Sequence, residues 1–334
     1  MPLVIPIFIP HEGCPHRCVF CNQRRISGFA ESPVTPADVE RTISTWLNRN
    51  NKRNSRVQVA FYGGSFTGLD RARQQELLAA AAPFVEQGRV AAVRLSTRPD
   101  YMDRETAAFL RRHHVSVVEL GVQSMNDMVL HAARRGHDRQ DVCKAVAVLR
   151  EAGMEIGIQL MIGLPADSRR KLMDTVKQVI QLQPDFMRIY PVLVVADSVL
   201  ARQYKEGKYQ PISLDMAVLL AAWMKKRFDE TGIRVVRMGL QSGPDLDQAL
   251  VAGPWHPAFG ELVNSRLMLQ QTRKLLLSVA RDTPVVLSIH EKDQSTFRGM
   301  HSGNIQRLQQ LGLWPQITLI TGREQPRGSV HLFS

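Results

Sequence analysis

Short apolar runs rich in Val and Ile recur along the first part of the chain, and each is followed by a longer stretch with helical periodicity. Such runs predict buried strands, because β-branched residues bounded by polar loops are typical of sheet interiors. They span residues 4–9, 57–62, 93–97, 117–122, 156–162 and 187–195. Strands that alternate with helices form right-handed crossovers and a parallel sheet. The pattern therefore predicts an α/β fold with six such units, a partial (β/α)6 barrel.

Helix signals lie between these strands. Thr35 precedes Pro36 and Asp38, which favours a helix start because Thr caps a first turn and proline fits its first position. Further helices are predicted over residues 71–85, 104–112, 138–151 and 168–182. In parallel barrels the catalytic groups gather at the C-terminal ends of the strands. The loops at those ends are rich in glycine and polar residues, so we expect the chemistry there.

The alternation of strands and helices changes after about residue 209. The later pattern predicts a helix over 214–231, a strand over 233–238, a helix over 262–277 and a strand over 284–289. We therefore expect two domains: a barrel over residues 1–210, and a smaller α+β C-terminal extension over residues 211–334 that covers the substrate side. The basic segment 321–328 is expected to be loosely ordered.

Composition narrows the class of protein. The chain has 334 residues, of which 44% are hydrophobic and 22% charged, as in globular proteins with one substantial core. The apolar run 1–10 contains prolines and has neither a basic start nor a small-residue cleavage site, so no secretory signal is predicted. No later apolar run approaches the roughly 20 residues that span a bilayer. We expect a cytoplasmic protein without a membrane partner.

The charge is strongly positive. Lys and Arg outnumber Asp and Glu by 43 to 31, which gives a net charge of +12. The excess lies in short runs, namely Arg24-Arg25, Lys52-Arg53, Arg111-Arg112, Arg134-Arg135 and Lys225-Lys226-Arg227. Such a field attracts polyanions, and RNA is the natural candidate. A solvated surface that is merely basic explains the same charge, because charge alone does not separate the two.

Cysteine spacing is the most specific signal in the chain. Three of the four cysteines, Cys14, Cys18 and Cys21, lie within eight residues directly after the first predicted strand. A disulfide framework would use a dispersed, even set of cysteines, so this grouping favours a metal site in a reducing compartment. The fourth cysteine, Cys143, stands alone in a predicted helix, where we expect it to be a buried spacer.

Two kinds of metal centre fit three cysteines. Thiolates are the usual ligands of iron–sulfur clusters, and three of them leave one iron of a four-iron cluster open to an exchangeable ligand. Zinc is the alternative, with His11 or His16 as the fourth ligand. A structural zinc knuckle carries a second ligand pair further along the chain, and this sequence has none. The spacing therefore favours the iron–sulfur cluster.

The CxxxCxxC spacing, with Phe20 just before the last cysteine, resembles the signature of the radical S-adenosylmethionine (SAM) superfamily. That resemblance implies a [4Fe-4S] cluster whose open iron chelates the amino and carboxylate groups of SAM. One electron, from a donor such as flavodoxin or ferredoxin, would cleave SAM to methionine and a 5′-deoxyadenosyl radical. The radical would then abstract hydrogen from the substrate.

Later strand ends resemble further segments of the same superfamily, namely RGH at 135–137 and LMxGLP at 160–165. TRPD at 97–100 and GVQS at 121–124 resemble segments of the group that contains the Elongator catalytic subunit and the oxygen-independent coproporphyrinogen oxidases. The resemblance implies SAM contacts at Gly63, Gly64, Ser65, Ser96, Gln123, Arg135 and Gln159.

Each of these contacts has an implied role. Glycines let backbone approach a ligand closely, and Ser65 stands where an acidic residue is common, so its hydroxyl and backbone carbonyls would bind the SAM amino group. Ser96, where a glutamate is usual, Gln123 and Gln159 would face the adenosine. Arg135 would pair with the SAM carboxylate, because a guanidinium binds carboxylates in bidentate fashion.

Several residues near these motifs have two interpretations. Arg98 and Asp100 form a local ion pair that closes a loop, or act directly in catalysis. His137 is expected at a helix start or in packing rather than as a general base. Tyr190 lines the substrate cavity or packs in the core. The aromatic stretch 253–263 caps a pocket, stacks on a base or plugs a domain interface.

The whole chain resembles the group that contains the radical SAM domain of the Elongator catalytic subunit, including GLQ at 239–241 and AGPxHPAF at 252–259, but without the acetyltransferase domain. The resemblance implies a radical SAM enzyme acting on tRNA or on a modified nucleobase derived from it. A lyase acting on a free modified base such as queuine is the alternative reaction. A non-catalytic iron–sulfur protein that binds RNA is the alternative of another class.

Overall fold

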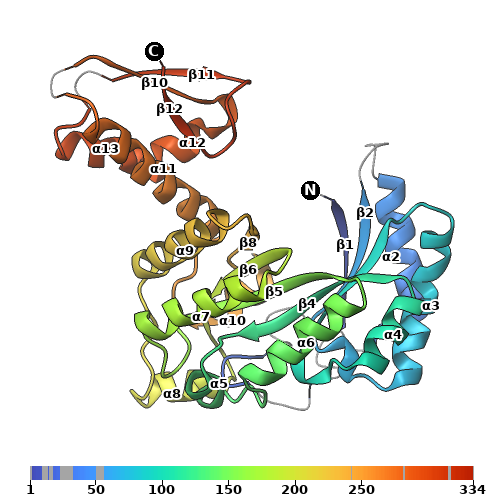
Figure 1. Cartoon of the computed structure of the whole chain (residues 1–334). Coiled ribbons are helices and arrows are strands. Elements are labelled where there is room, and N and C mark those ends of the chain that lie inside the picture. Colours follow the sequence, from blue (N-terminus) through green and yellow to red (C-terminus); the bar gives the residue numbers. More distant parts are fainter. Residues whose placement is uncertain are drawn as a thin grey trace.

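Figure 1 shows the fold in a computed structural model of the chain, which describes residues 2–9, 14, 18–22, 33–49, 56–241, 243–280, 283–314 and 317–333. Seven parallel strands form one sheet in the order β1-β2-β3-β4-β5-β6-β8, and this sheet curls into a half-barrel. The strands are β1 (Leu3–Phe8), β2 (Val57–Tyr62), β3 (Ala92–Thr97), β4 (Val115–Gln123), β5 (Glu155–Ile162), β6 (Phe186–Pro191) and β8 (Arg234–Met238). The predicted α/β fold with a partial barrel is confirmed.

The number of strands differs from the prediction. Segment 233–238, assigned above to the extension, forms β8 and pairs in parallel with β6. The sixth predicted strand, over 187–195, is shorter, because its end separates as β7 (Val194–Val195) and pairs with β9 (Leu250–Ala252). The path from β6 to β8 includes β7 and a short helix, α8 (Val199–Lys205), before helix α9 (Leu214–Asp229) makes the crossover. This longer path hid the seventh strand in the sequence, and the main sheet continues past residue 210.

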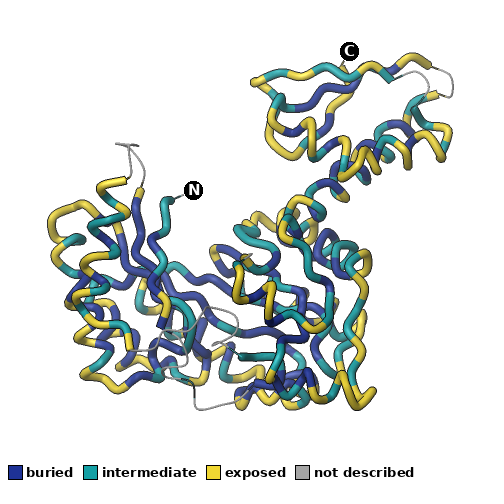
Figure 2. The backbone as a smooth tube through the Cα atoms, turned by 180° about the vertical axis from the view of Figure 1, so that it is seen from behind, coloured by how far each residue is buried: buried dark blue, intermediate teal, exposed yellow. Residues whose placement is uncertain are grey.

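Helices cover the outer face of the half-barrel (Figure 1). They are α2 (Pro36–Arg49), α3 (Arg71–Glu86), α4 (Arg104–Arg112), α6 (Arg139–Glu151), α7 (Arg169–Leu182) and α9. Leu77, Leu110, Leu149 and Phe228 of these helices are fully buried against the strands, which Figure 2 shows as a largely buried layer. Each such side chain stabilises the fold by roughly 1.5–3 kcal/mol when it leaves water. This burial fixes the strands whose ends carry the candidate site.

Side-chain caps explain why these helices begin where they do. Asp103 accepts a hydrogen bond from the backbone N–H of Thr106 at 2.7 Å, at the start of α4. Asp138 and Asp141 form a capping box at the start of α6. Ser168 accepts from the backbone of the first turn of α7. Caps of this kind satisfy N–H groups that the helix itself leaves unpaired, so three predicted helix starts are confirmed within one residue.

Helix α11 (Phe259–Leu277) connects the half-barrel to a small α+β unit, which Figure 1 shows set off from the main sheet. The unit has a three-stranded sheet in the order β11-β10-β12, with two helices beside it. Its elements are β10 (Val285–His290), β11 (Ile317–Gly322), β12 (Val330–Leu332), α12 (Gln294–Arg298) and α13 (Gly303–Gln310). Leu287, Ile289, Phe297 and Leu308 form its separate core.

The segment 321–328, expected to be loosely ordered, is instead held in place between β11 and β12. Asp293, which is 3% exposed, accepts hydrogen bonds from Arg327 Nε and from the backbone N–H of Gly328, both at 2.6 Å. A buried carboxylate needs such donors, because unpaired burial is costly. The expectation of loose order was therefore wrong.

None of the helices in the described ranges is long and apolar enough to cross a membrane.

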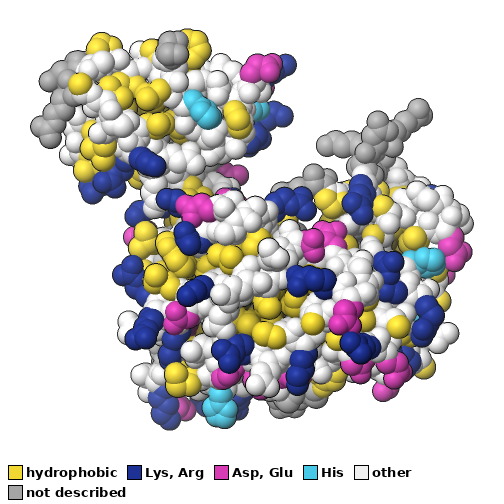
Figure 3. Space-filling model, viewed as in Figure 1, with side chains coloured by type: hydrophobic (Ala, Val, Ile, Leu, Met, Phe, Trp, Pro, Cys, Tyr) yellow, Lys and Arg dark blue, Asp and Glu magenta, His cyan; other side chains and the backbone are white. Residues whose placement is uncertain are grey.

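Positive charge on the surface is partly compensated. Figure 3 shows Lys and Arg side chains spread over one face, with Asp and Glu among them. Lys225 Nζ lies 2.6 Å from Asp229 Oδ2, and Arg227 Nη1 lies 2.8 Å from Glu230 Oε2. The most basic run of the sequence is therefore paired with carboxylates at the end of its own helix. The run Arg24-Arg25 and the run Lys52-Arg53 lie outside the described residues.

One glycine of β5 makes room for an aromatic ring. A Cβ atom at Gly157 would lie 2.4 Å from ring atoms of Phe186 on β6, which is closer than real Cβ atoms approach. Phe186 is buried, and the guanidinium of Arg94 on β3 stacks over its ring with 5.1 Å between the guanidinium carbon and the ring centre. The missing side chain thus lets Phe186 enter the space between neighbouring strands and support Arg94.

We predict that Gly157→Ala destabilises the protein by about 1–3 kcal/mol, because the added methyl group overpacks a buried site. The free energy of urea unfolding measures this. Phe186→Leu in the same chain should restore part of the loss by removing the ring. Gly303→Ala is the matched control, since nothing lies within 4 Å of a Cβ there. Equal unfolding midpoints for Gly157→Ala and the wild type would show that the site relaxes freely.

Candidate active site

The three clustered cysteines follow β1, at the C-terminal end of the sheet. Cys18 is buried, whereas Cys14 and Cys21 are half-buried. The backbone N–H of Cys21 donates to the carbonyl of Cys18 at 3.1 Å, which makes a tight turn. Val19 between them is fully buried and bonds through its backbone to Ala133 and Leu200. The cysteine segment is therefore anchored to the loops after β4 and β6.

Two cysteine sulfurs accept hydrogen bonds from the surrounding loops. The backbone N–H of Ser65 donates to Cys14 Sγ at 3.2 Å, and Arg135 Nη1 donates to Cys18 Sγ at 3.0 Å. Burial raises the pKa of the Cys14 thiol, while the Ser65 N–H and the charge of Arg135 act in the opposite direction. Donors aimed at sulfur stabilise thiolates, which are the form that ligates metals. The sulfurs therefore fit a metal centre.

Gly63 and Ser65 shape the loop after β2. Gly63 has φ +104°, and a Cβ there would lie 3.1 Å from the carbonyl oxygen of Ile9, so only glycine fits without strain. The hydroxyl of Ser65 lies 2.9 Å from that of Thr97 and accepts from the N–H of Arg98 at 3.3 Å. The sequence interpretation directed this hydroxyl at SAM. In the structure it ties β2 to β3, which leaves the loop backbone to face the cavity.

Gln123 and Arg135 converge above Gly121 near the end of β4. A Cβ at Gly121 would lie 3.2 Å from Gln123 Nε2 and 3.3 Å from Arg135 Nη2. Arg135 Nη2 also donates to the carbonyl of Gly121 at 2.5 Å. Arg135 Nε and Gln123 Oε1 are buried and have no hydrogen-bond partner among the described residues. A buried donor and a buried acceptor without partners are costly, so both atoms are suited to a polar ligand in the cavity that the two residues line.

Gln123 is also strained. Its φ is +68°, in the left-handed region, and the register between β4 and β5 shifts between Leu120 and Gln123. Such a conformation costs on the order of 1–3 kcal/mol in a residue other than glycine and persists mainly at functional sites. Further along the rim, Gln159 Nε2 donates to Ser96 Oγ at 3.4 Å.

All the residues that the sequence pointed to line one cavity. Its volume is about 1880 Å³, and its lining includes Gly63, Gln123 and Pro191 at the C-terminal ends of the strands. The residues in question are Cys14, Cys18, Cys21, Gly63, Gly64, Ser65, Ser96, Gln123, Arg135 and Gln159. Small-molecule sites typically measure about 300–1,000 Å³. This cavity therefore has room for a cofactor and for part of a second molecule.

An ionic cluster inside the half-barrel was not predicted from the sequence. Glu119 on β4 is fully buried and pairs with Arg94 on β3 and with Arg188 on β6, whose Nε lies 2.9 Å from Glu119 Oε2. Tyr62 on β2 donates to Glu119 Oε1 at 2.9 Å, and Gln159 donates to Oε2 at 3.2 Å. A charged residue inside each apolar strand was the signal that could have revealed this cluster.

Comparison with known proteins identifies the family. The model of the radical SAM superfamily matches residues 8–179, which is more than half of the chain. The chain belongs to the radical SAM superfamily. A second model, the radical SAM C-terminal domain, matches residues 184–268. That match begins at β6 and includes β8, in agreement with a seventh strand in the main sheet.

Individual relatives support the resemblance to the Elongator group. An uncharacterized protein of Methanocaldococcus jannaschii is 28% identical over 218 residues, 62% of this chain and 66% of its own length. The tRNA uridine(34) acetyltransferase of the same organism is 24% identical over 66% of this chain and 48% of its own length. The archaeal Elongator protein 3 of Methanocaldococcus infernus has a similar fold, with a TM-score of 0.64, 20% identity, and coverage of 81% of this chain and 64% of that chain. This radical SAM chain thus spans about half the length of the acetyltransferases it matches.

The zinc alternative involves residues outside the described ranges. His11 and His16 both lie there. Within the described residues, no three His, Cys, Asp or Glu side chains are grouped around one metal-ion position. A four-iron cluster does not need such a group, because each cysteine binds a different iron atom. The absence of such a group therefore does not count against the cluster.

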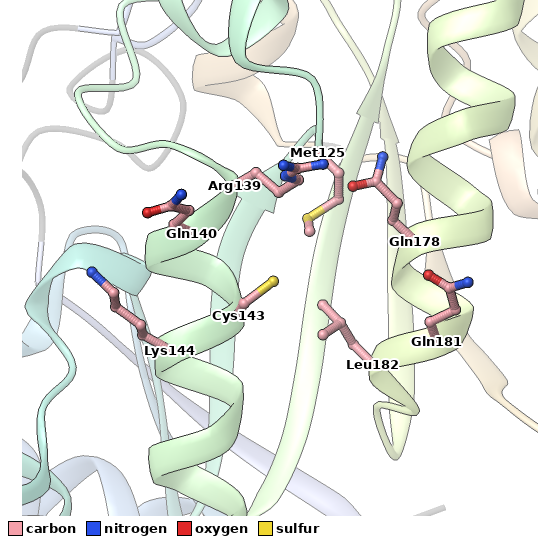
Figure 4. Close-up of a pocket in the computed structure, with 8 residues that line it drawn as sticks. All are labelled: Met125, Arg139, Gln140, Cys143, Lys144, Gln178, Gln181 and Leu182. Atoms are coloured by element: carbon pink, nitrogen blue, oxygen red, sulfur yellow. The ribbon is translucent and has the colours of Figure 1, made fainter.

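Cys143 is exposed rather than buried, which corrects the sequence expectation. It lies on α6 at a surface pocket between α6 and α7, which Figure 4 shows (the pocket residues are Met125, Arg139, Gln140, Cys143, Lys144, Gln178, Gln181 and Leu182). The buried face of α6 consists of Val142, Ala145, Val146 and Leu149. Since a residue occupies about 100° of a helical turn, position 143 falls beside this face and not within it.

The structure gives the contacts and burial of the residues for which the sequence left two interpretations. Arg98 binds Asp100 through two hydrogen bonds, Nε to Oδ1 at 3.0 Å and Nη2 to Oδ2 at 2.8 Å, so the local ion pair is present. Tyr190 is half-buried and lines the cavity. His137 is buried just before α6, with Nε2 3.3 Å from the carbonyl of Val122. Burial, and then the charge of Arg135, lowers the pKa of His137 to about 3.

We predict that His137 makes this protein sensitive to acid. Its folded pKa of about 3 lies below the unfolded value near 6.5, so its contribution to stability is present above about pH 6.5 and is lost as the pH falls toward 3. In His137→Gln, the free energy of unfolding should depend less on pH between 6.5 and 4, by about one bound proton. Urea unfolding at several pH values measures the slope. The exposed His301→Gln is the control, and an unchanged slope in His137→Gln would contradict the prediction.

Proposed function

We propose that this radical SAM enzyme uses a [4Fe-4S] cluster and SAM to act on tRNA or on a modified nucleobase derived from tRNA. The observation that carries the proposal is that three cysteines and seven strand-end residues, identified independently of the structure, line one cavity. The names of the relatives that modify tRNA uridine 34 support the choice of substrate class.

The cysteines would hold the cluster in this proposal. Cys14, Cys18 and Cys21 supply three thiolates, which leaves one iron open for SAM. The cluster and SAM, when bound, supply one-electron cleavage to methionine and a 5′-deoxyadenosyl radical that abstracts hydrogen from the substrate. Ser65 N–H and Arg135 Nη1 keep their sulfur acceptors negatively charged and oriented.

The remaining rim residues would bind and orient SAM. Arg135 Nε is a buried donor without a described partner, and we assign to it the SAM carboxylate. Gln123 Oε1, a buried acceptor without a described partner, is assigned to a ribose hydroxyl. Ser96 and Gln159 are assigned to the adenosine, and the loop backbone around Gly63 and Gly64, together with Ser65, to the amino group.

We also propose an electron donor and a cellular compartment for this enzyme. A flavodoxin or ferredoxin would supply the electron, and a reducing compartment such as the cytoplasm would keep the three cysteines available for the cluster. The C-terminal unit beyond α11 supplies none of the described residues that line the cavity. We therefore propose that it contacts a large substrate outside the cavity.

We predict that Cys14→Ala, Cys18→Ala and Cys21→Ala each abolish formation of 5′-deoxyadenosine from SAM after anaerobic reconstitution and reduction. The loss follows because each variant removes one iron ligand. Cys143→Ala, at an exposed position of the same residue type, should retain both the brown colour of the cluster and the activity. A correctly formed cluster without SAM cleavage would sink the enzyme proposal, and a colourless protein containing zinc would favour the zinc alternative.

Substrate class is tested by salt dependence. We predict that the affinity for tRNA falls steeply as salt rises, because binding to phosphates releases counterions, and about six contacts lose roughly a thousandfold between 50 and 200 mM. Arg202 is exposed at the cavity rim, so Arg202→Gln should reduce the slope by about one. Lys225→Gln is the control, since Asp229 already neutralises that charge.

The other outcomes favour the alternatives. Affinity for a free modified base that does not change with salt would favour the lyase reaction on a base such as queuine, and the cavity of about 1880 Å³, which has room for such a base, supports this as the second candidate. Salt-dependent tRNA binding together with absent SAM cleavage would favour the non-catalytic iron–sulfur protein that binds RNA.

A further inference from the structure

The ionic cluster inside the half-barrel has features that the proposed SAM site does not use. Its members come from five neighbouring strands, β2 to β6, and none of them belongs to the cysteine segment. Arg94, Arg188, Tyr62, Gln58 and Tyr190 all line the cavity, while Glu119 lies behind them with no exposed surface.

Glu119 holds both guanidinium groups in place. One of its oxygens accepts from Arg94 Nη2 and from the hydroxyl of Tyr62, and the other lies 2.9 Å from Arg188 Nε. Arg188 Nη2 also donates to the Tyr62 hydroxyl at 2.7 Å, and Nη1 to the Tyr190 hydroxyl at 3.3 Å. Burial, and then the charge of Glu119, raises the pKa of Tyr62, so its phenol remains a donor. The two arginines are therefore fixed in orientation before any ligand arrives.

The cluster carries an excess of positive charge. Two guanidinium groups face one carboxylate, and Arg94 is 6% exposed. Around the whole cavity, eight arginines and four acidic side chains are present among the described lining residues. Removing charges from water costs several kcal/mol per ion unless opposite charges compensate. An excess of buried cations is a stable arrangement when an anion completes it.

The arginines of the cluster also have hydrogen-bond donors without a described partner. Arg94 Nη1 donates to Gln58 Oε1 at 2.9 Å and Nη2 to Glu119, but Nε is buried without a hydrogen-bond partner among the described residues. A guanidinium has five N–H donors, and the described hydrogen bonds of Arg188 use two of its nitrogens, Nη1 and Nη2, while Nε lies 2.9 Å from Glu119 Oε2 as an ion pair without a hydrogen bond. A purely structural role would not require this excess, because apolar residues of similar volume stabilise a core at least as well.

We infer that Arg188 and Arg94 bind an anionic group of the substrate, a carboxylate or a phosphate, and that Glu119 and Tyr62 position them for it. Both groups match the planar fork of a guanidinium. The inference rests on the proposed function, since it assigns the anionic group of the proposed substrate to these two arginines. A phosphate would belong to a nucleotide or an RNA strand, and a carboxylate to a small acid.

The test measures binding without radical chemistry, so its failure and the failure of SAM cleavage are distinguishable. The reconstituted full chain is heated in the presence of inorganic phosphate or succinate, at constant ionic strength set with sodium chloride. A bound anion raises the melting temperature in a saturable way. We expect Arg188→Gln to raise the half-saturating anion concentration at least about tenfold, as the loss of a charge-assisted hydrogen bond does.

Two further variants keep the test decisive. Arg188→Lys retains the charge but not the fork, so it should weaken anion binding even if Arg188→Gln does not fold. Arg104→Gln is the matched control, because Arg104 is exposed and pairs with Glu151 on the surface. A preference for phosphate or for succinate distinguishes the two sources of the anion.

Three outcomes would overturn the inference. The first is that neither anion stabilises the wild type beyond sodium chloride. The second is that Arg104→Gln loses the effect as Arg188→Gln does. The third is that saturating SAM abolishes the anion effect, because the anion would then occupy the cofactor site rather than a substrate site.

Discussion

The structure depends on a difference between the two faces of one parallel sheet, of which the outer face packs against helices and the inner face carries polar side chains. Parallel strands are stable when both faces are covered, and here helices close only the outer face. The inner face keeps its strands in register while carrying arginine, glutamate, tyrosine and glutamine side chains that compensate one another. Leu77, Leu110 and Leu149 provide the apolar burial on the other side, which allows the inner face to be polar.

The cysteine end of the cavity and the ionic cluster around Glu119 are built from different kinds of position in the chain. The cysteines and Gly63 come from loops after the strands, where Gly63 adopts a positive φ and the cysteine segment is tied to α5 (Asp127–Ala132) and α8 (Val199–Lys205). The ionic groups lie within strands and are fixed by pleat and register, with Glu119 opposite Ser96 and Arg188 opposite Gln159. The cysteine positions therefore depend on loop conformation, and the positions of the ionic groups depend on the sheet itself.

Sequence reasoning succeeded where one local signal decided the outcome. Apolar runs located β2 and β3, capping residues located α4 and α6, and spacing located the three cysteines. It failed where distant parts decide. The position of β8 depends on its pairing with β6, and the exposure of Cys143 depends on which face of α6 meets the sheet. The Glu119 cluster was missed because three strands supply its charges, and no single segment shows them together.

The main sheet ends at β1 on one side and at β8 on the other, and the order of its strands does not close into a ring. Open sheet edges invite pairing with other chains, and proline on an edge strand prevents it because proline has no N–H to donate. Pro6 stands within β1, opposite Ala60 of β2. The half-barrel can thus leave its first strand without a partner on the outer side and still not recruit a neighbouring chain, so the protein keeps its sheet open without the aggregation that an unprotected edge would invite.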